Sequence, residues 1–117
     1  MEIKDYKSII DKSPVGYACH KILYDEDGMP YDYEFVDINN AFERITGKNA
    51  SDMIGRKASE ALQDRTGIDS GWLKTCSDIA LNGGSKEIED YSLGSNRWYR
   101  VFIFSPETGY FITWVFD

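Results

Sequence analysis

The sequence is poor in the residues that build most metal, disulfide and catalytic sites. It has one histidine, two cysteines and three prolines in 117 residues. Cys19 and Cys76 lie far apart and do not have the spacing of a metal-binding motif. We therefore expect no metal site, and we expect both thiols to be reduced, as in cytoplasmic proteins.

Long apolar runs and basic clusters are also missing. No segment approaches the roughly 20 apolar residues of a membrane-spanning helix, and the charged N-terminus does not resemble a signal peptide. The net charge is −7, and no cluster of lysine and arginine could bind nucleic acid or an anionic membrane. The composition predicts a cytoplasmic protein with no nucleic-acid partner and no direct membrane contact.

The sequence contains enough apolar residues for one hydrophobic core. Hydrophobic residues make up 42% of the chain, and 117 residues suit a single domain. The patterns predict helices at 2–12, before Gly47, at 51–54 and at 71–81, and strands at 15–24, 31–38, 86–92, 97–105 and 110–116. Strands grouped at both ends of the chain, with helices between them, predict an antiparallel sheet covered by helices on one face.

Two further patterns bear on how this sheet is covered. Asn40 and Glu43 fit a capping box for the helix that Gly47 ends. The strands WYRVFIF (98–104) and YFITWVF (110–116) do not alternate apolar with polar residues. A strand that is solvated on one side should alternate, so we expect both faces of the sheet to be covered.

Two segments resemble a known family. INNAFERITGKNASDMIGRK at 38–57 is similar to the strand-to-helix segment of the PAS superfamily, and RWYRVFIFSPETGYFITWVFD at 97–117 is similar to its last hairpin. The second segment ends on Asp117, which matches the aspartate that opens the family's Asp-Ile-Thr linker. The resemblance extends over residues 13–117.

The resemblance implies a fold and a domain organisation. The expected fold class is α+β: a PAS-like five-stranded antiparallel sheet with short helices on one face and an N-terminal amphipathic helix. Residues 1–13 would form that capping helix, and residues 14–117 the PAS domain of a larger signalling protein. In such proteins the domain leads into a histidine kinase, a diguanylate cyclase or another PAS domain. We therefore expect a sensory input module that signals to a C-terminal output domain outside this chain.

The resemblance also places a ligand cavity between the sheet and the short helices. Family geometry turns Phe111, Thr113 and Val115 inward on the last strand, and the same reasoning turns Arg100 and Phe102 inward on the strand before it, along with Trp98 and Phe104. The predicted ligand-binding residues are Phe42, Ile54, Trp72, Cys76, Ile79, Arg100, Phe102 and Thr113. Arg100 would hold a ligand carboxylate or phosphate; the alternative is a salt bridge to a carboxylate of the chain.

No cofactor is predicted, although an unknown small organic ligand remains an expectation. The flavin-binding light sensors of the family carry a cysteine motif that the segment DRTGIDSGW at 64–72 does not match. Haem sensors use a histidine on the long helix, whereas the one histidine here, His20, lies on the first strand and is expected at the surface. A haem or flavin sensor is therefore the alternative reading, in which the Cys76 thiolate could bind haem iron.

Catalysis by the chain itself is not expected. No acid is paired with a base or nucleophile in a recognisable motif, and Gly83-Gly84 lacks the lysine of a phosphate-binding loop. We expect a homodimer instead. Its interface would join the apolar stripe of the N-terminal helix to the outward row of the last strand, and the predicted residues are Ile3, Tyr6, Ile9, Ile10, Ile112, Trp114 and Phe116.

Overall fold

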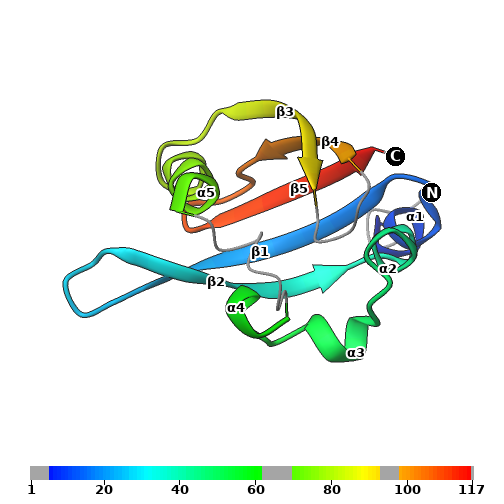
Figure 1. Cartoon of the computed structure of the whole chain (residues 1–117), viewed down its shortest axis with the longest axis horizontal. Helices are drawn as coiled ribbons and strands as arrows, with labels where there is room; N and C mark the ends of the chain where they lie inside the picture. The colour runs from blue at the N-terminus through cyan, green and yellow to red at the C-terminus, as the bar shows by residue number, and fades with distance from the viewer. Residues whose placement is uncertain (1–5, 62–69, 93–97, 117) are drawn as a thin grey trace.

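A computed structural model describes residues 6–61, 70–92 and 98–116 of the chain (Figure 1). Five strands form one antiparallel sheet, as predicted, in the order β2-β1-β5-β4-β3. The strands are β1 (Gly16–Tyr24), β2 (Pro30–Ile38), β3 (Ser85–Ser92), β4 (Trp98–Phe104) and β5 (Tyr110–Phe116). The first and the last strand of the chain, β1 and β5, therefore pair at the centre of the sheet.

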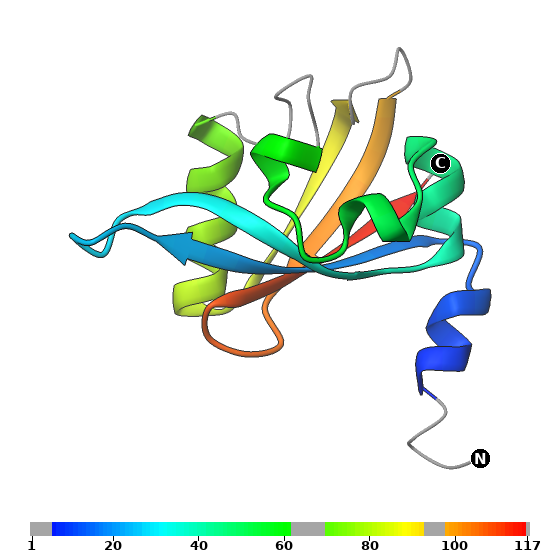
Figure 2. The ribbon, with the colours of Figure 1, turned by 90° about the horizontal axis from the view of Figure 1, so that it is seen from below.

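Four helices cover one face of this sheet, which we call the inner face. They are α2 (Asn40–Thr46), α3 (Ala50–Met53), α4 (Ala58–Ala61) and α5 (Ser70–Asn82). The longest of them, α5, contacts β2, β4 and β5. The N-terminal helix α1 (Tyr6–Lys12) contacts α2 instead and extends away from the sheet (Figure 2). The expected α+β fold is confirmed.

The core lies between the inner face and the helices. Residues that pair directly across antiparallel strands share a face, and Val101 pairs with Val115 as Ile103 pairs with Thr113. The buried strand residues on this face include Ala18, Ile22, Tyr33, Phe35, Tyr99, Val101, Ile103, Phe111 and Val115. From the other side Phe42, Met53, Trp72, Cys76 and Ile79 pack against them. All these side chains belong to one cluster, as expected for a single domain.

The start of α2 differs from its prediction by one residue. The capping residue is Asn39, not Asn40, and its side chain accepts a hydrogen bond from the Phe42 amide. Glu43 does not close a capping box. Its carboxylate accepts instead from the Ala50 amide, at 2.7 Å, and so caps the next helix, α3. Gly47 ends α2 in the left-handed conformation that glycine favours, with φ of 73°.

The free edge of β2 is covered by the segment that follows α3. The Gly55 amide donates to the Phe35 carbonyl at 2.8 Å, and the Phe35 amide donates to the Arg56 carbonyl at 3.0 Å. Gly55 has a φ of 84°, which lets the chain turn back along the strand. At the start of β2, the buried carboxylate of Asp32 accepts from the Ser59 hydroxyl at 2.6 Å and thereby anchors α4 beside the sheet.

Candidate functional site

Five of the eight predicted ligand-binding residues meet beneath the helices. Phe42, Trp72, Cys76, Ile79 and Thr113 are all buried on the inner side of the sheet. Trp72 and Cys76 are four residues apart on α5, so their side chains lie on the same face of the helix, toward the strands. The region between the inner face and α5, which these packed side chains fill, is where the family resemblance places a ligand; we call it the chamber, and we call these five residues the inner set.

The remaining three predicted residues do not join the inner set. Ile54 lies at the covered edge of β2 and is 41% exposed. Arg100 pairs with Phe116 and Phe102 with Trp114, so both lie on the outer face of the sheet. The prediction of which β4 side chains point inward is therefore wrong by one position. The register of β4 against β5 turns Tyr99, Val101 and Ile103 inward instead, and a one-residue slip moves a whole strand to the other face.

Arg100 has a partner within its own chain. Its Nε lies 3.1 Å from Glu87 Oε1 on the neighbouring strand, and both side chains are about half exposed. Its guanidinium also lies over the ring of Phe116, 5.0 Å from the centroid. The arginine thus adopts the alternative considered from the sequence, a salt bridge to a chain carboxylate. An exposed pair of this kind contributes little to stability.

The inner face also holds a residue that the sequence analysis placed at the surface. His20 is only 3% exposed and its ring stacks on Phe111, with centroids 4.3 Å apart and planes 12° apart. Tyr33 meets the imidazole edge-on, at 5.1 Å, and Phe35 lies at 4.9 Å. The alternation of inward residues on β1, from Ala18 to Ile22, was the signal that could have placed His20 inside.

The surroundings of His20 keep it neutral. Its Nδ1 lies 3.2 Å from the Phe111 carbonyl, which can only accept, so Nδ1 carries the proton. Burial among the rings disfavours the charged imidazolium and lowers the pKa of His20 to about 3, although the bond to Phe111 opposes the shift. In this tautomer the lone pair of the ring is on Nε2.

Other polar atoms of the chamber are few. The Trp72 indole donates from Nε1 to the Tyr33 hydroxyl at 3.2 Å and links α5 to β2. Burial raises the pKa of the Cys76 thiol well above its usual value, so this sulfur is a neutral thiol and not a thiolate. The side chains of this region are therefore mostly apolar, with a few fixed polar groups among them.

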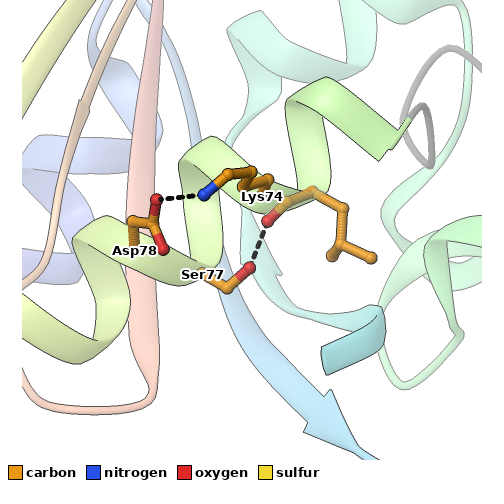
Figure 3. Close-up of polar contacts among 4 residues, drawn as sticks. Lys74, Ser77 and Asp78 are labelled. Carbon is orange, nitrogen blue, oxygen red and sulfur yellow. Dashed lines mark hydrogen bonds and ion pairs between the residues drawn. The ribbon is translucent and has the colours of Figure 1, made fainter. Parts of the chain in front are cut away.

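Polar groups of α5 pair with one another both on its exposed side, at Lys74 and Asp78, and at the buried Ser77. Figure 3 shows Lys74 paired with Asp78 one turn along the helix, with Nζ and Oδ2 separated by 3.4 Å. It also shows the Ser77 hydroxyl donating to the Leu73 carbonyl within the helix. These groups satisfy one another on α5, so they leave the inward stripe of the helix free to pack on the sheet.

A surface hollow lies apart from the inner set. It is a half-open groove of about 310 Å³ lined by Gly47, Lys48, Asn49, Asp52, Arg56, Glu60 and Ala61. None of the predicted ligand-binding residues lines it. Its side chains are polar and carry both signs of charge, so it differs in chemistry from the apolar chamber.

The described residues contain neither a metal-binding cluster nor a helix that could span a membrane. Across 6–61, 70–92 and 98–116, no group of three or more histidine, cysteine or carboxylate side chains is placed to hold a metal ion. Over the same ranges, none of the helices has the length and the apolar character that a membrane crossing requires.

The residues predicted for a dimer interface lie in two places. Ile112, Trp114 and Phe116 are half-buried on the outer face of β5, where the Tyr17 ring lies 5.2 Å from that of Trp114. On α1, Ile9 is 45% exposed and Ile10 is half-buried. Ile3 and the side chain of Tyr6 lie outside the described residues. The described residues of the predicted interface therefore belong to two separate elements, α1 and the outer face of β5.

Comparisons with known proteins agree with this architecture. Residues 4–80 match a family model described as a PAS domain. No curated protein matches the sequence. A domain of a sensory box sensor histidine kinase/response regulator from Geobacter sulfurreducens superposes with a TM-score of 0.64 and 14% identity, over 97% of this chain and 92% of that one.

Two further solved structures are similar. The PAS domain of Bordetella pertussis BvgS superposes with a TM-score of 0.58 and 17% identity, over 98% of this chain and 85% of that one. An RNA-binding Light-Oxygen-Voltage receptor superposes with a TM-score of 0.62 and 20% identity, over 97% of this chain. This chain spans 32% of that receptor. At such identities the likeness is one of fold.

Proposed function

Because the chain belongs to the PAS domain family, we propose that it is a non-catalytic sensory input module, which binds a small organic ligand in the chamber and signals to an output domain of the same protein. The observation that carries the proposal is the aromatic box around His20. A neutral imidazole packed among the rings of Tyr33, Phe35 and Phe111 would offer a ligand aromatic contacts and hydrogen bonding at one place on the inner face. A histidine kinase or a diguanylate cyclase is the class of output domain we propose.

The chemistry of the chamber limits which ligands fit. No charged side chain belongs to the inner set, and Arg100, the cation once expected there, lies on the outer face. An anionic ligand would find no counter-charge, and burying an unpaired charge is costly. We therefore propose an uncharged ligand that donates a hydrogen bond to His20 Nε2 or accepts one from the Thr113 hydroxyl. This replaces the carboxylate or phosphate ligand first considered for Arg100.

Native mass spectrometry of the purified domain tests the ligand proposal. We expect a fraction of the protein to carry one small uncharged molecule, and we expect the absorption spectrum to show neither a Soret band nor a flavin band. Thr113→Val should weaken retention of that molecule by about tenfold, which corresponds to the loss of one hydrogen bond.

The matched control is Thr46→Val, because Thr46 donates to the Phe42 carbonyl within α2 and does not belong to the inner set. A Soret or flavin band would instead establish the haem or flavin alternative. Equal retention by the Thr113→Val variant and the unmutated protein would contradict the chamber as the binding site, and would direct attention to the groove beside Lys48.

We further propose that the domain forms a homodimer through α1 and the outer face of β5. Seven residues are too few for a stable free helix, and Ile9 offers its side chain to a partner. The outer face adds Ile112, Trp114 and Phe116, with Phe102 and Phe104 on the strand beside them. A two-fold partner is the commonest way to cover such surfaces in soluble proteins.

Sedimentation at micromolar concentration tests the dimer. We expect a dimer for the unmutated protein and a folded monomer for Trp114→Glu and for Ile9→Glu, since each places a charge in the proposed interface. Lys74→Glu is the matched control, because it changes an exposed charge on α5, on the other side of the sheet. A monomeric unmutated protein would defeat the dimer proposal.

A further inference from the structure

The polar groove beside α3 is built from segments that are each tied to the rest of the fold. Glu43 on α2 accepts from the Ala50 amide at 2.7 Å, which joins the end of α2 to the start of α3. The Arg56 carbonyl accepts from the Phe35 amide at 3.0 Å and ties the chain after α3 to β2. The bond from the Ser59 hydroxyl to the sheet anchors α4. The groove is therefore formed before any ligand arrives, and a preformed site loses little affinity to ordering.

Four charged side chains line this groove, two of each sign. Lys48 and Arg56 are the cations, and Asp52 and Glu60 are the anions. Within residues 6–61, 70–92 and 98–116, none of these four side chains makes an ion pair or a side-chain hydrogen bond. Their charges are therefore kept apart in one hollow and are open to a ligand.

The mixture of signs restricts what the groove can hold. A ligand with only negative charge would meet the carboxylates of Asp52 and Glu60, and one with only positive charge would meet Lys48 and Arg56. Like charges brought together in this way are unfavourable, and an apolar ligand would remove water from charged groups without replacing it. A molecule with both an ammonium and a carboxylate gives each pair a counter-charge. The volume of about 310 Å³ is at the lower end for ligand sites, so the molecule must be small.

We propose that the groove is a second binding site, which takes a small zwitterion, a molecule of amino-acid size with one ammonium and one carboxylate. The guanidinium of Arg56 can hold the carboxylate through two hydrogen bonds, with the Lys48 ammonium beside it. Asp52 and Glu60 accept from the ammonium of the ligand. The side chain of Asn49, which caps no helix, is available to either group. The proposal goes beyond the sensor function and does not depend on it, because the groove shares no residue with the inner set.

NMR titration of the isotope-labelled domain tests the site with single compounds. Glycine, L-serine and L-glutamine are the probes, because they share the two charged groups and differ in side chain. Acetate and methylammonium carry the same groups on separate molecules. We expect the probes to shift the amide signals of residues 47–61 to saturation, and acetate and methylammonium, even together, to give no saturation at matched concentrations, since only a linked pair makes its second contact within one complex. Added salt should weaken the binding, because the groove is half-open to solvent.

Two substitutions test the assignment of the charges. Arg56→Gln and Asp52→Asn should each weaken binding of the best probe about tenfold, as expected for the loss of a charge-assisted hydrogen bond at an open site. Lys57→Gln is the matched control, because its Nζ lies over the Tyr31 ring, 5.5 Å from the centroid, and does not line the groove. The proposal is overturned if none of the probes gives saturating shifts, if acetate alone does so, or if Lys57→Gln weakens binding as much. Saturating shifts confined to the inner set would support the chamber and would equally overturn the groove.

Discussion

Lowering the pH from about 6.5 to about 4.5 is expected to reduce the free energy of unfolding by about 2–3 kcal/mol through His20 alone. The unfolded chain takes up a proton on this histidine near its ordinary pKa of 6.5, whereas burial lowers the pKa in the folded domain to about 3. The stabilising contribution is therefore complete above pH 6.5 and is lost as the pH falls toward 3. The loss is about 1.4 kcal/mol for each pH unit.

Urea unfolding at several pH values measures this loss, and His20→Asn isolates it. The asparagine Nδ2 can take the place of the imidazole Nδ1 and donate to the Phe111 carbonyl, but the side chain does not titrate. The variant should be less stable at neutral pH, because it loses the ring contacts, yet its stability should fall less steeply with acid. Carboxylates contribute equally to both proteins, so parallel pH curves would disprove the role given to His20.

Phe111→Ala is expected to lower the free energy of unfolding by about 3–5 kcal/mol, the usual range for removing a buried phenylalanine. Phe111 is fully buried at the centre of the sheet, and its ring stacks on His20 and meets Tyr33 edge-on. The substitution also exposes one side of the imidazole to a cavity. The pKa of His20 should then rise toward its ordinary value, and the acid dependence of stability should weaken.

Thermal and urea unfolding of the variant at neutral and acid pH give both quantities. Tyr31→Ala is the matched control, since this tyrosine is 48% exposed on β2 and lies outside the proposed dimer interface. Its effect should be below about 1.5 kcal/mol, because less apolar surface leaves water there on folding. A variant of Phe111 that keeps the full acid dependence would show that the ring does not control the protonation of His20.

Apart from α4, which was not predicted, the order and extent of the elements could be predicted closely from the sequence because local signals mark their ends. Glycines at 28, 47, 55, 83 and 109 adopt the left-handed conformation where helices and strands were expected to stop. Alternation of apolar and polar residues predicted β1 and β2, and apolar residues at helical spacing from Trp72 to Ala80 predicted α5. The capping residue of α2 was misplaced by one position, because two asparagines stand side by side and either one fits the pattern.

Which side chains of β4 point toward the inner face could not be predicted, for a physical reason. Its residues are apolar at almost every position, so neither face is marked by polarity. The inward set is decided by pairing with β5, a partner whose register is not local information. Arg100 was the one polar marker, and its salt bridge to Glu87 depends on a third strand, β3. Of the candidate site, the helical residues were therefore predicted better than those of the sheet.

The covered edge of β2 has a consequence for how copies of the domain can aggregate. Residues 54–57 occupy the backbone groups of Phe35, at the middle of β2, and β3 is the strand at the other end of the sheet. A fibre of sheets joined edge to edge requires two open edges on every molecule. Because the β2 edge is interrupted at Phe35, a strand of another copy could not pair along its whole length there. The turn at Gly55 thus disfavours growth by strand pairing beyond two copies joined through β3.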